Sequence, residues 1–241
     1  MKENKMMDCE DGVCANDVPV EGNVKVENET SSKGELIYFG DPMCSWCWGI
    51  TNHLDQLRDE FKGMLDFKMV MGGLRPGGGD LWNDEMKAFL REHWEHVAEA
   101  SGQPFNFGLL DQDEFNYDTE PAARAVRVVR DLKPDQELEF YKAVQHTFYV
   151  ENKDPGAVEF YRPLCEQIGV AFDTFKTLFE SDGYKQLVRQ DFMYAQQLGV
   201  RGFPSVVLQQ GDQYTAISMG YSTFDKMKQR VEELLSHVAN S

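Results

Sequence analysis

Two short apolar runs with a helical pattern between them open the patterned part of the chain. Residues 35–39 (ELIYF) and 66–71 (DFKMVM) have the length and the β-prone composition of buried strands. Between them, the apolar positions Leu54, Leu57 and Phe61 follow helical spacing. A strand–helix–strand unit almost always closes right-handed with its strands parallel. We therefore predict that these two strands pair in parallel.

The rest of the chain divides into a long helical block and a short β segment. After a glycine-rich loop at 72–80, helical signals are all that we find up to residue 198. The expected helices span roughly 81–101, 119–132, 135–149, 157–168, 173–180 and 183–198. Residues 205–209 and 213–218 then predict a hairpin, and residues 223–238 an amphipathic helix. The predicted order is β-α-β, a helical block, and β-β-α.

The first 34 residues carry a different pattern. They hold four lysines and eight acidic residues, with no aromatic residue and no periodic apolar face. Such a segment cannot bury enough apolar surface to offset the entropy that it loses on ordering. We therefore predict a disordered acidic tail over residues 1–34, with ordered structure from Glu35 onward.

The charge balance and the hydropathy exclude several classes of function. The 241 residues include 24 basic and 41 acidic ones, and the net charge of −17 repels phosphate backbones and acidic lipids. We expect no nucleic-acid partner and no membrane partner. No window approaches a membrane-spanning helix, and the first ten residues lack the apolar run of a secretory signal, which favours a cytoplasmic location. Five cysteines in such a chain are more often redox-active, catalytic or metal-binding than structural.

The sequence Cys44-Ser-Trp-Cys47 places two cysteines at the start of the first predicted helix. Positions i and i+3 share one face of a helical turn, so the two sulfur atoms can come within bonding distance. The unpaired amides and the positive dipole end of a helix N-terminus stabilise a thiolate, which is the attacking species. We expect Cys44 to be the nucleophile, with a lowered pKa. Cys47, one turn further and more buried, would be the resolving thiol.

A proline far along the chain sharpens this interpretation. The segment Gly199-Val-Arg-Gly-Phe-Pro-Ser205 directly precedes the third predicted strand, and an X–Pro bond is the usual place for a cis peptide. We predict that the Phe203–Pro204 bond is cis and lies against the cysteines. Pro204 would then keep a backbone N–H away from the sulfurs, and the Phe203 backbone would be free to pair with an extended substrate. Trp46 and Phe203 would offer an apolar platform for unfolded substrate.

Four segments together resemble the DsbA-like family of thiol–disulfide oxidoreductases, in its cytosolic FrnE-like branch of protein-disulfide isomerases. They are the strand–DPMCSWCWG–helix start, the GGLRPG loop, the run Tyr117-Asp-Thr-Glu-Pro-Ala122 and the GVRGFPS segment. The resemblance covers about residues 35–240. It implies an α/β thioredoxin fold with a long all-helical insertion. Residues 35–71 and 199–241 would form the thioredoxin-like domain, and residues 72–198 the insertion.

The same resemblance identifies Cys44 as the nucleophile, Cys47 as the resolving cysteine and Pro204 as the cis proline. It implies a protein disulfide oxidoreductase or isomerase that acts on protein thiols and disulfides, with glutathione as a second candidate partner. We expect no cofactor and no metal at the site. The Ser-Trp pair between the cysteines differs from the Pro-His pair of the periplasmic oxidant DsbA. Because these residues tune thiolate stability, the direction of the redox chemistry stays open.

Several alternatives remain at this point. Kappa-class glutathione transferases and hydroxychromene-carboxylate isomerases are similar to DsbA, but they generally carry a Ser or a single thiol at the position of Cys44 and do not need Cys47. Cys9 and Cys14 could complete a four-cysteine zinc site with that pair, form an auxiliary dithiol, or be incidental thiols. A zinc-binding N-terminal segment would suit a non-enzymatic module resembling a protease adaptor. Asp41 is either a turn or cap residue or a carboxylate that assists proton transfer.

Overall fold

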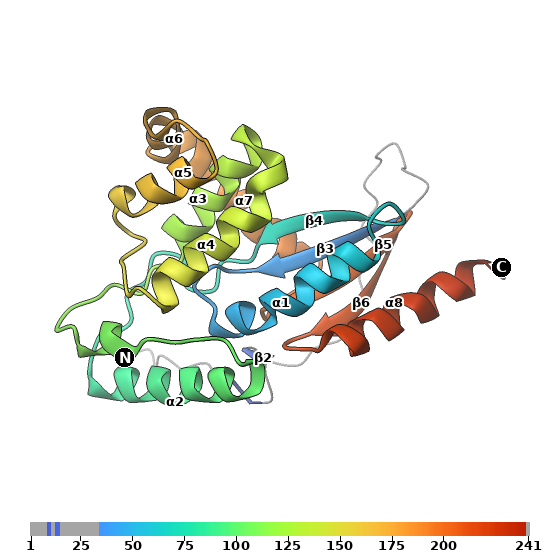
Figure 1. Cartoon of the computed structure of the whole chain (residues 1–241), viewed down its shortest axis with the longest axis horizontal. Coiled ribbons are helices and arrows are strands. Elements are labelled where there is room, and N and C mark those ends of the chain that lie inside the picture. Colours follow the sequence, from blue (N-terminus) through green and yellow to red (C-terminus); the bar gives the residue numbers. More distant parts are fainter. Residues whose placement is uncertain (1–8, 11–12, 15–33, 240–241) are drawn as a thin grey trace.

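The computed structural model describes residues 9–10, 13–14 and 34–239, which are built on a four-stranded mixed sheet (Figure 1). The strands are β3 (Glu35–Gly40), β4 (Asp66–Met71), β5 (Ser205–Gln210) and β6 (Gln213–Met219), in the order β4-β3-β5-β6. Strand β3 pairs in parallel with β4 and antiparallel with β5, and β5 forms a hairpin with β6. The predicted parallel pair and the predicted hairpin are both confirmed.

Strand β3 is buried on both faces of the sheet. Leu36 and Tyr38 belong to the apolar cluster that includes α1 (Ser45–Glu60) and α8 (Phe224–Ala239), whereas Ile37 and Phe39 belong to a second cluster that includes α7 (Asp182–Gln197). Alternate residues of a strand face opposite sides of its sheet. Figure 1 shows the matching arrangement, with α1 and α8 on one face and α7 against β4 on the other. This burial explains why the first run is continuously apolar.

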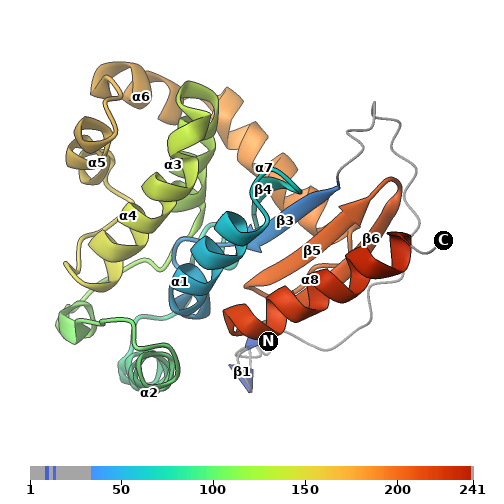
Figure 2. The same ribbon diagram turned by 45° about the vertical axis from the view of Figure 1, so that its right-hand side comes forward.

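The segment between β4 and β5 is helical, as predicted. Besides α7, its helices are α2 (Asp84–Ser101), α3 (Glu120–Leu132), α4 (Glu137–Tyr149), α5 (Arg162–Gln167) and α6 (Phe172–Phe179), with short 3-10 turns η1 (Phe107–Asp111), η2 (Pro134–Gln136) and η3 (Val158–Tyr161). Figure 2 shows α3 to α6 gathered beyond the end of β3, and α2 separate from them below α1. These helices therefore surround the edge of the sheet at which α1 begins.

The structure describes only four residues before Gly34, so the predicted disorder of the tail stays a prediction. Strand β1 (Cys9–Glu10) pairs antiparallel with β2 (Val13–Cys14), and Cys9 lies opposite Cys14 in the register. The other residues up to 33 lie outside the described residues. The sequence between these strands is Asp-Gly, a pair that is common in two-residue hairpin loops.

Two further elements differ from the predicted ones. The 3-10 turn η1 was not predicted, because five residues are too few to show helical periodicity. Helix α2 begins at Asp84 instead of residue 81. The side chain of Asn83 accepts a hydrogen bond from the Met86 amide over 2.9 Å and so caps the helix there.

An ion cluster attaches the end of β4 to the helical segment. The Arg130 guanidinium on α3 contacts Glu137 at 2.6 Å and Asp191 of α7 at 2.9 Å. Asp191 also accepts a hydrogen bond from the Met71 amide over 3.1 Å. One carboxylate thus bonds both the last residue of β4 and a helix of the insertion, which holds the loop after β4 in place.

Gly72, the first residue after β4, leaves no room for a side chain. A Cβ atom built there would lie 2.1 Å from Cε1 of Phe203. The Phe203 ring is 5% exposed, so it cannot swing into solvent without opening the core. The loop after β4 can therefore pass against the segment that enters β5 only because residue 72 is a glycine.

We predict that Gly72→Ala lowers the free energy of unfolding by about 1–3 kcal/mol, because the added methyl group overpacks the contact with Phe203. Chemical denaturation measures the change. Gly183→Ala is the matched control, because a Cβ there would meet its nearest neighbour, the Ser181 hydroxyl oxygen, only at 3.8 Å. Equal stability of the two variants would contradict the prediction.

Candidate active site

The turn between β3 and α1 presents the two cysteines. Cys44 is the N-cap residue of α1 with an extended backbone (φ −88°, ψ 119°), and Cys47 lies in the first turn of the helix. The Cys44 amide donates to the Asp41 carbonyl over 3.0 Å, and its own carbonyl accepts the first helical hydrogen bond, from Trp48, over 3.0 Å. Cys44 and Cys47 are both free thiols in this structure. The prediction that the helix begins at the cysteine pair is therefore confirmed.

The register of the sheet brings Pro204 to these cysteines. Strands β3 and β5 are antiparallel and pair Phe39 with Ser205, so the chain leaving β3 and the chain entering β5 meet at one edge of the sheet. The Phe203–Pro204 peptide bond is cis, and the Cys44 thiol donates a hydrogen bond to the Phe203 carbonyl over 3.5 Å. The cis bond and the contact that the sequence predicts are both present.

Burial changes the expected acidity of Cys44. The exposed fraction is 1% for Cys44 and 0% for Cys47. Removal from water raises the pKa of the Cys44 thiol well above its usual range, and the adjacent Cys47 thiol raises it further. A hydrogen bond from the Cys47 backbone N–H lowers this pKa but does not compensate for the burial. The lowered pKa that we expected is therefore wrong for this conformation, in which desolvation outweighs the helix N-terminus.

Segments of the helical insertion and its flanking loops cover Cys44. The cavity beside the thiol measures only about 30 Å³, which holds about one or two water molecules. The loop after β4 contributes Leu74 and Arg75 to its wall, α2 contributes His93, and the segment before α3 contributes Tyr117. A client disulfide can therefore reach the Cys44 sulfur only after part of this cover moves.

Trp46 and Phe203 do not form an exposed platform in this structure. Their exposed fractions are 3% and 5%. The Trp46 ring packs against His96 at 5.4 Å and Tyr221 at 5.3 Å between ring centroids, and its Nε1 is buried without a hydrogen-bond partner. Both side chains lie at the cysteines as expected, but they become available to substrate only when the cover opens. Their role as a substrate platform stays a prediction.

Asp41 proves to be a buried turn residue that joins two loops. Its side chain is 0% exposed, and its two carboxylate oxygens accept hydrogen bonds from the Met43 amide over 2.9 Å and from the Leu74 amide over 2.8 Å. Burial raises the pKa of this carboxyl to about 6, against these hydrogen bonds, which lower it. The charged carboxylate also raises the pKa of Cys44. Asp41 therefore shapes the turn and contributes to the raised pKa of the Cys44 thiol.

Buried tyrosine hydroxyls around the cysteines escaped the sequence analysis. The Tyr38 hydroxyl lies 3.1 Å from that of Tyr141, which donates to the Asp41 carbonyl over 3.1 Å. Tyr117 donates to the carbonyl of Met43 over 2.8 Å. In the sequence Tyr38 looks like any aromatic residue of a buried strand, so no local signal distinguishes it from its neighbours.

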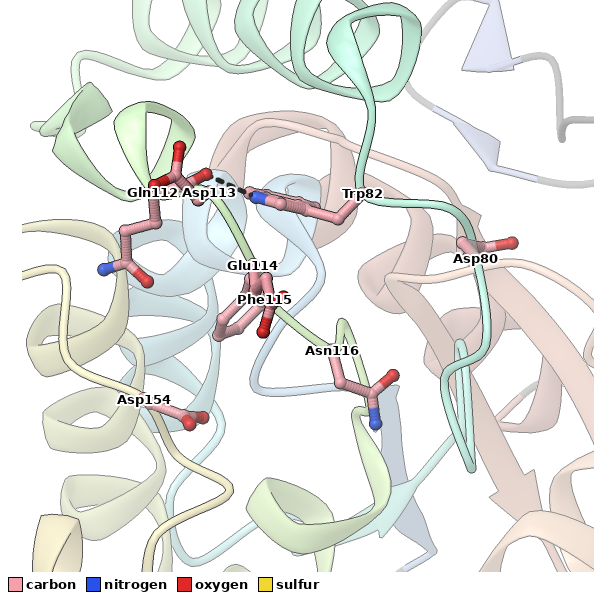
Figure 3. A pocket seen from close by; sticks show the side chains of 8 residues that line it. All are labelled: Asp80, Trp82, Gln112, Asp113, Glu114, Phe115, Asn116 and Asp154. Atoms are coloured by element: carbon pink, nitrogen blue, oxygen red, sulfur yellow. Dashed lines mark hydrogen bonds between the residues drawn. The ribbon is translucent and has the colours of Figure 1, made fainter.

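Figure 3 shows a second and larger hollow. It measures about 530 Å³ and is lined by acidic, amide and aromatic side chains: Asp80, Trp82, Gln112, Asp113, Glu114, Phe115, Asn116 and Asp154. An ion pair links the two linings, because Arg75 lines the cavity at Cys44 and its partner Asp80 lines the larger hollow. No cysteine lines the larger hollow, whereas Cys44 lines the smaller cavity.

The remaining cysteines lie away from this pair or beyond what the structure describes. Cys165 on α5 is fully buried in the apolar cluster, and burial raises its pKa to about 12, as suits an unreactive core thiol. The side chains of Cys9 and Cys14 lie outside the described atoms, so the zinc and auxiliary-dithiol hypotheses stay predictions. Within residues 34–239 no three His, Cys, Asp or Glu side chains are grouped to hold a metal ion. None of the described helices is long and apolar enough to cross a membrane.

We predict a pH dependence of stability that belongs to Asp41. Its pKa rises from 3.8 to about 6 on folding, so the folded state disfavours the charged form and stability falls as the pH rises through this range. The fall amounts to about 3 kcal/mol and should be absent in Asp41→Asn. Urea unfolding at about pH 4 and about pH 7 tests this. Parallel changes in the wild type and the variant would show that another group is responsible.

Comparisons with known proteins agree with this geometry. Residues 35–232 match the family model described as DSBA-like thioredoxin domain. A candidate protein disulfide isomerase from Nitrosomonas europaea is 33% identical, with 85% of this chain and 98% of that chain covered and a TM-score of 0.78. The cytosolic disulfide reductase DsbM from Pseudomonas aeruginosa is 22% identical, with 86% and 100% covered and a TM-score of 0.67. Its structure with GSH is also similar, at 24% identity, with 84% and 99% covered and a TM-score of 0.64.

The family match covers the strands, the cysteine pair and the segment with the cis proline. The sheet order, the helical segment between β4 and β5, and the contact between Cys44 and Phe203 account for that match in physical terms. The chain belongs to the family of DSBA-like thioredoxin domains and has its α/β thioredoxin fold.

Proposed function

We propose that this protein is a thiol–disulfide oxidoreductase of the protein-disulfide reductase or isomerase type, acting through Cys44 and Cys47. The observation that carries the proposal is the position of the Cys44 sulfur, at a helix N-terminus and 3.5 Å from the carbonyl that precedes the cis Pro204. Membership of the family supports thiol–disulfide chemistry in general. The order of steps and the roles of single residues are our inference.

The exchange balances without a bound cofactor. The Cys44 thiolate attacks one sulfur of a client disulfide, a Cys44–client bond forms, and the other client sulfur leaves and takes up a proton. The Cys47 thiolate then attacks the Cys44 sulfur, and the second client sulfur leaves. The client gains two electrons and two protons, and the enzyme ends as a Cys44–Cys47 disulfide. Two molecules of an external thiol of the glutathione class restore the dithiol and leave as their own disulfide. In an isomerase cycle, two thiols of the same client instead return the electrons to the enzyme and form a new client disulfide.

The burial of Cys44 supports a reductase or isomerase more than a strong oxidant. Strong dithiol oxidants owe their potential to a stabilised thiolate, which favours the reduced form. Here burial raises the pKa of the Cys44 thiol, so the reduced form lacks that stabilisation. DsbM, whose fold this chain shares, is described as a cytosolic disulfide reductase. We extend this to a cytoplasmic location and to protein thiols and disulfides as substrates.

A glutathione-dependent transferase or isomerase is the second candidate. The cavity at Cys44 has the Arg75 side chain in its wall, which would suit a ligand carboxylate, and the structure of DsbM with GSH has a similar fold. That chemistry needs one thiol, whereas this chain brings two together. Glutathione-dependent isomerase turnover that survives Cys47→Ala would favour this candidate over dithiol exchange.

We predict that Cys47→Ala accumulates mixed disulfides between Cys44 and client proteins, because the resolving thiol is gone. Non-reducing gel electrophoresis and peptide mass mapping would detect them. Cys165→Ala is the matched control, since that thiol is equally buried but lies on α5. Absence of trapped clients, together with no insulin reduction by the wild type, would refute the proposed function.

We also predict a reduction potential for the Cys44–Cys47 couple nearer to that of thioredoxin, about −270 mV, than to that of DsbA, about −120 mV. The physical reason is the unstabilised Cys44 thiolate. Equilibration in glutathione buffers, with the two thiols quantified by alkylation and mass spectrometry, measures it. A potential close to that of DsbA would identify an oxidant instead.

A further inference from the structure

The indole of Trp46, between the two cysteines, holds a buried hydrogen-bond donor without an acceptor. Its side chain is 3% exposed, and its Nε1 has no hydrogen-bond partner among the described residues. The indoles of Trp48 and Trp82, by contrast, each donate to a backbone carbonyl, over 3.1 Å and 2.9 Å. A buried N–H without an acceptor costs free energy, because it has lost its bond to water. The Trp46 N–H is therefore free to bind a ligand that brings its own acceptor.

Three rings from two separate elements pack against the Trp46 indole. His93 and His96 of α2 lie edge-on to it, with ring centroids 6.4 Å and 5.4 Å away. Tyr221, in the loop between β6 and α8, lies at 5.3 Å with its plane tilted by 43°. Tyr221 also packs against the apolar cluster that contains Trp46 and both active-site cysteines. The free donor and the reactive sulfurs thus lie in one cluster, and Tyr221 covers part of it.

Tyr221 is the part of this cover that can move at the lower cost. Its side chain is half-buried, and its hydroxyl donates to the Ala100 carbonyl over 3.2 Å and lies 3.2 Å from Nε2 of His53. Water can replace hydrogen bonds of a half-exposed hydroxyl. Helix α2, by contrast, is anchored by Trp94, which is 1% exposed and lies edge-on to Tyr149 at 5.3 Å. A shift of α2 would expose this aromatic core to water, so displacing Tyr221 is the cheaper way to uncover the indole.

The loop that carries Tyr221 is attached to the segment with the cis proline. The Gly220 amide donates to the Pro204 carbonyl over 2.7 Å. The Phe203 carbonyl, one residue earlier, accepts the hydrogen bond from the Cys44 thiol over 3.5 Å. A client whose disulfide reaches Cys44 therefore arrives beside Tyr221.

We propose that Trp46 binds the client through a hydrogen bond from its indole N–H to a backbone carbonyl next to the client disulfide, in the place that Tyr221 leaves when the client displaces it. Every residue of an extended polypeptide offers such a carbonyl, whatever its side chain. The net charge of −17 disfavours a client carboxylate as the acceptor. This inference rests on the proposed function and deepens it, because it names the client group that is recognised.

Competition between two thiols for Cys44 measures this contact directly. The full-length protein carries alanine at the other four cysteines, Cys47 included, so that Cys44 is its only thiol. It is equilibrated with a short peptide that has one cysteine and capped, uncharged ends, together with mercaptoethanol and the disulfides of both. Mass spectrometry gives the ratio of the peptide mixed disulfide to the mercaptoethanol mixed disulfide. Mercaptoethanol has no carbonyl, so a change in the reactivity of Cys44 itself cancels from this ratio.

For Trp46→Phe we expect the ratio to fall by about three- to ten-fold, as befits the loss of one hydrogen bond while an apolar ring is kept. Trp82→Phe is the matched control and should leave the ratio unchanged, because that indole already donates to the Gln112 carbonyl. In Tyr221→Phe the hydroxyl that holds the cover is gone, so the ratio should rise by about two-fold or more.

A second measurement leaves Trp46 in place and keeps the inference testable if Trp46→Phe does not fold. In the ¹⁵N-labelled protein, the Trp46 indole resonance is assigned from its contacts with the His96 and Tyr221 rings. Its proton should move downfield in the peptide mixed disulfide and stay in place in the mercaptoethanol one.

The outcomes separate this inference from the proposed function. An unchanged ratio in Trp46→Phe, an equal fall in Trp82→Phe, a ratio that does not rise in Tyr221→Phe, or an indole proton that moves equally in both mixed disulfides would overturn the inference alone. Failure of Cys44 to form either mixed disulfide would instead refute the proposed function, and this inference with it.

Discussion

The antiparallel register between β3 and β5 is the constraint on which the site depends. Because Phe39 pairs with Ser205, the turn that follows one strand and the segment that precedes the other meet at a single edge of the sheet. A slip of one residue would exchange the two faces of β3 and move the Phe203 carbonyl away from the Cys44 sulfur. The loop after β4 lies at the same place, and Gly72 allows it to pass close to the Phe203 ring.

Burial gives this cysteine pair its chemical character. A helix N-terminus lowers the pKa of a thiol that lies there. At Cys44 the surrounding side chains exclude water, and the loss of hydration raises the pKa by more than the helix N-terminus lowers it. Cys44 is therefore held as a thiol in this structure. Under the function that we propose, a client has to displace part of the cover before it reaches the Cys44 sulfur, and the water that enters would lower the pKa of the thiol.

The buried polar groups near the cysteines hold the turn between β3 and α1 in place. The two oxygens of the Asp41 carboxylate each accept a hydrogen bond from a backbone amide. These bonds keep the turn between β3 and α1 next to the loop after β4. The Tyr38 and Tyr141 side chains are fully buried, and the Tyr141 hydroxyl donates to the Asp41 carbonyl over 3.1 Å, so this pair supports the same turn. A hydroxyl carries no charge of its own, so it adds this support without the cost of a second buried ion.

The sequence by itself determined the strands of the sheet and the contact between Cys44 and the segment that holds Pro204. Periodicity predicted all four strands of the central sheet, and the cysteine spacing and the proline predicted the contact between Cys44 and the cis Phe203–Pro204 bond, because these signals are local. The tertiary structure alone decided the burial of Cys44 and thus the direction of its pKa shift, and it alone brought Tyr38 and Tyr141 together. These two tyrosines are 103 positions apart. Desolvation and long-range hydrogen bonds depend on which segments pack together, and no local pattern encodes that.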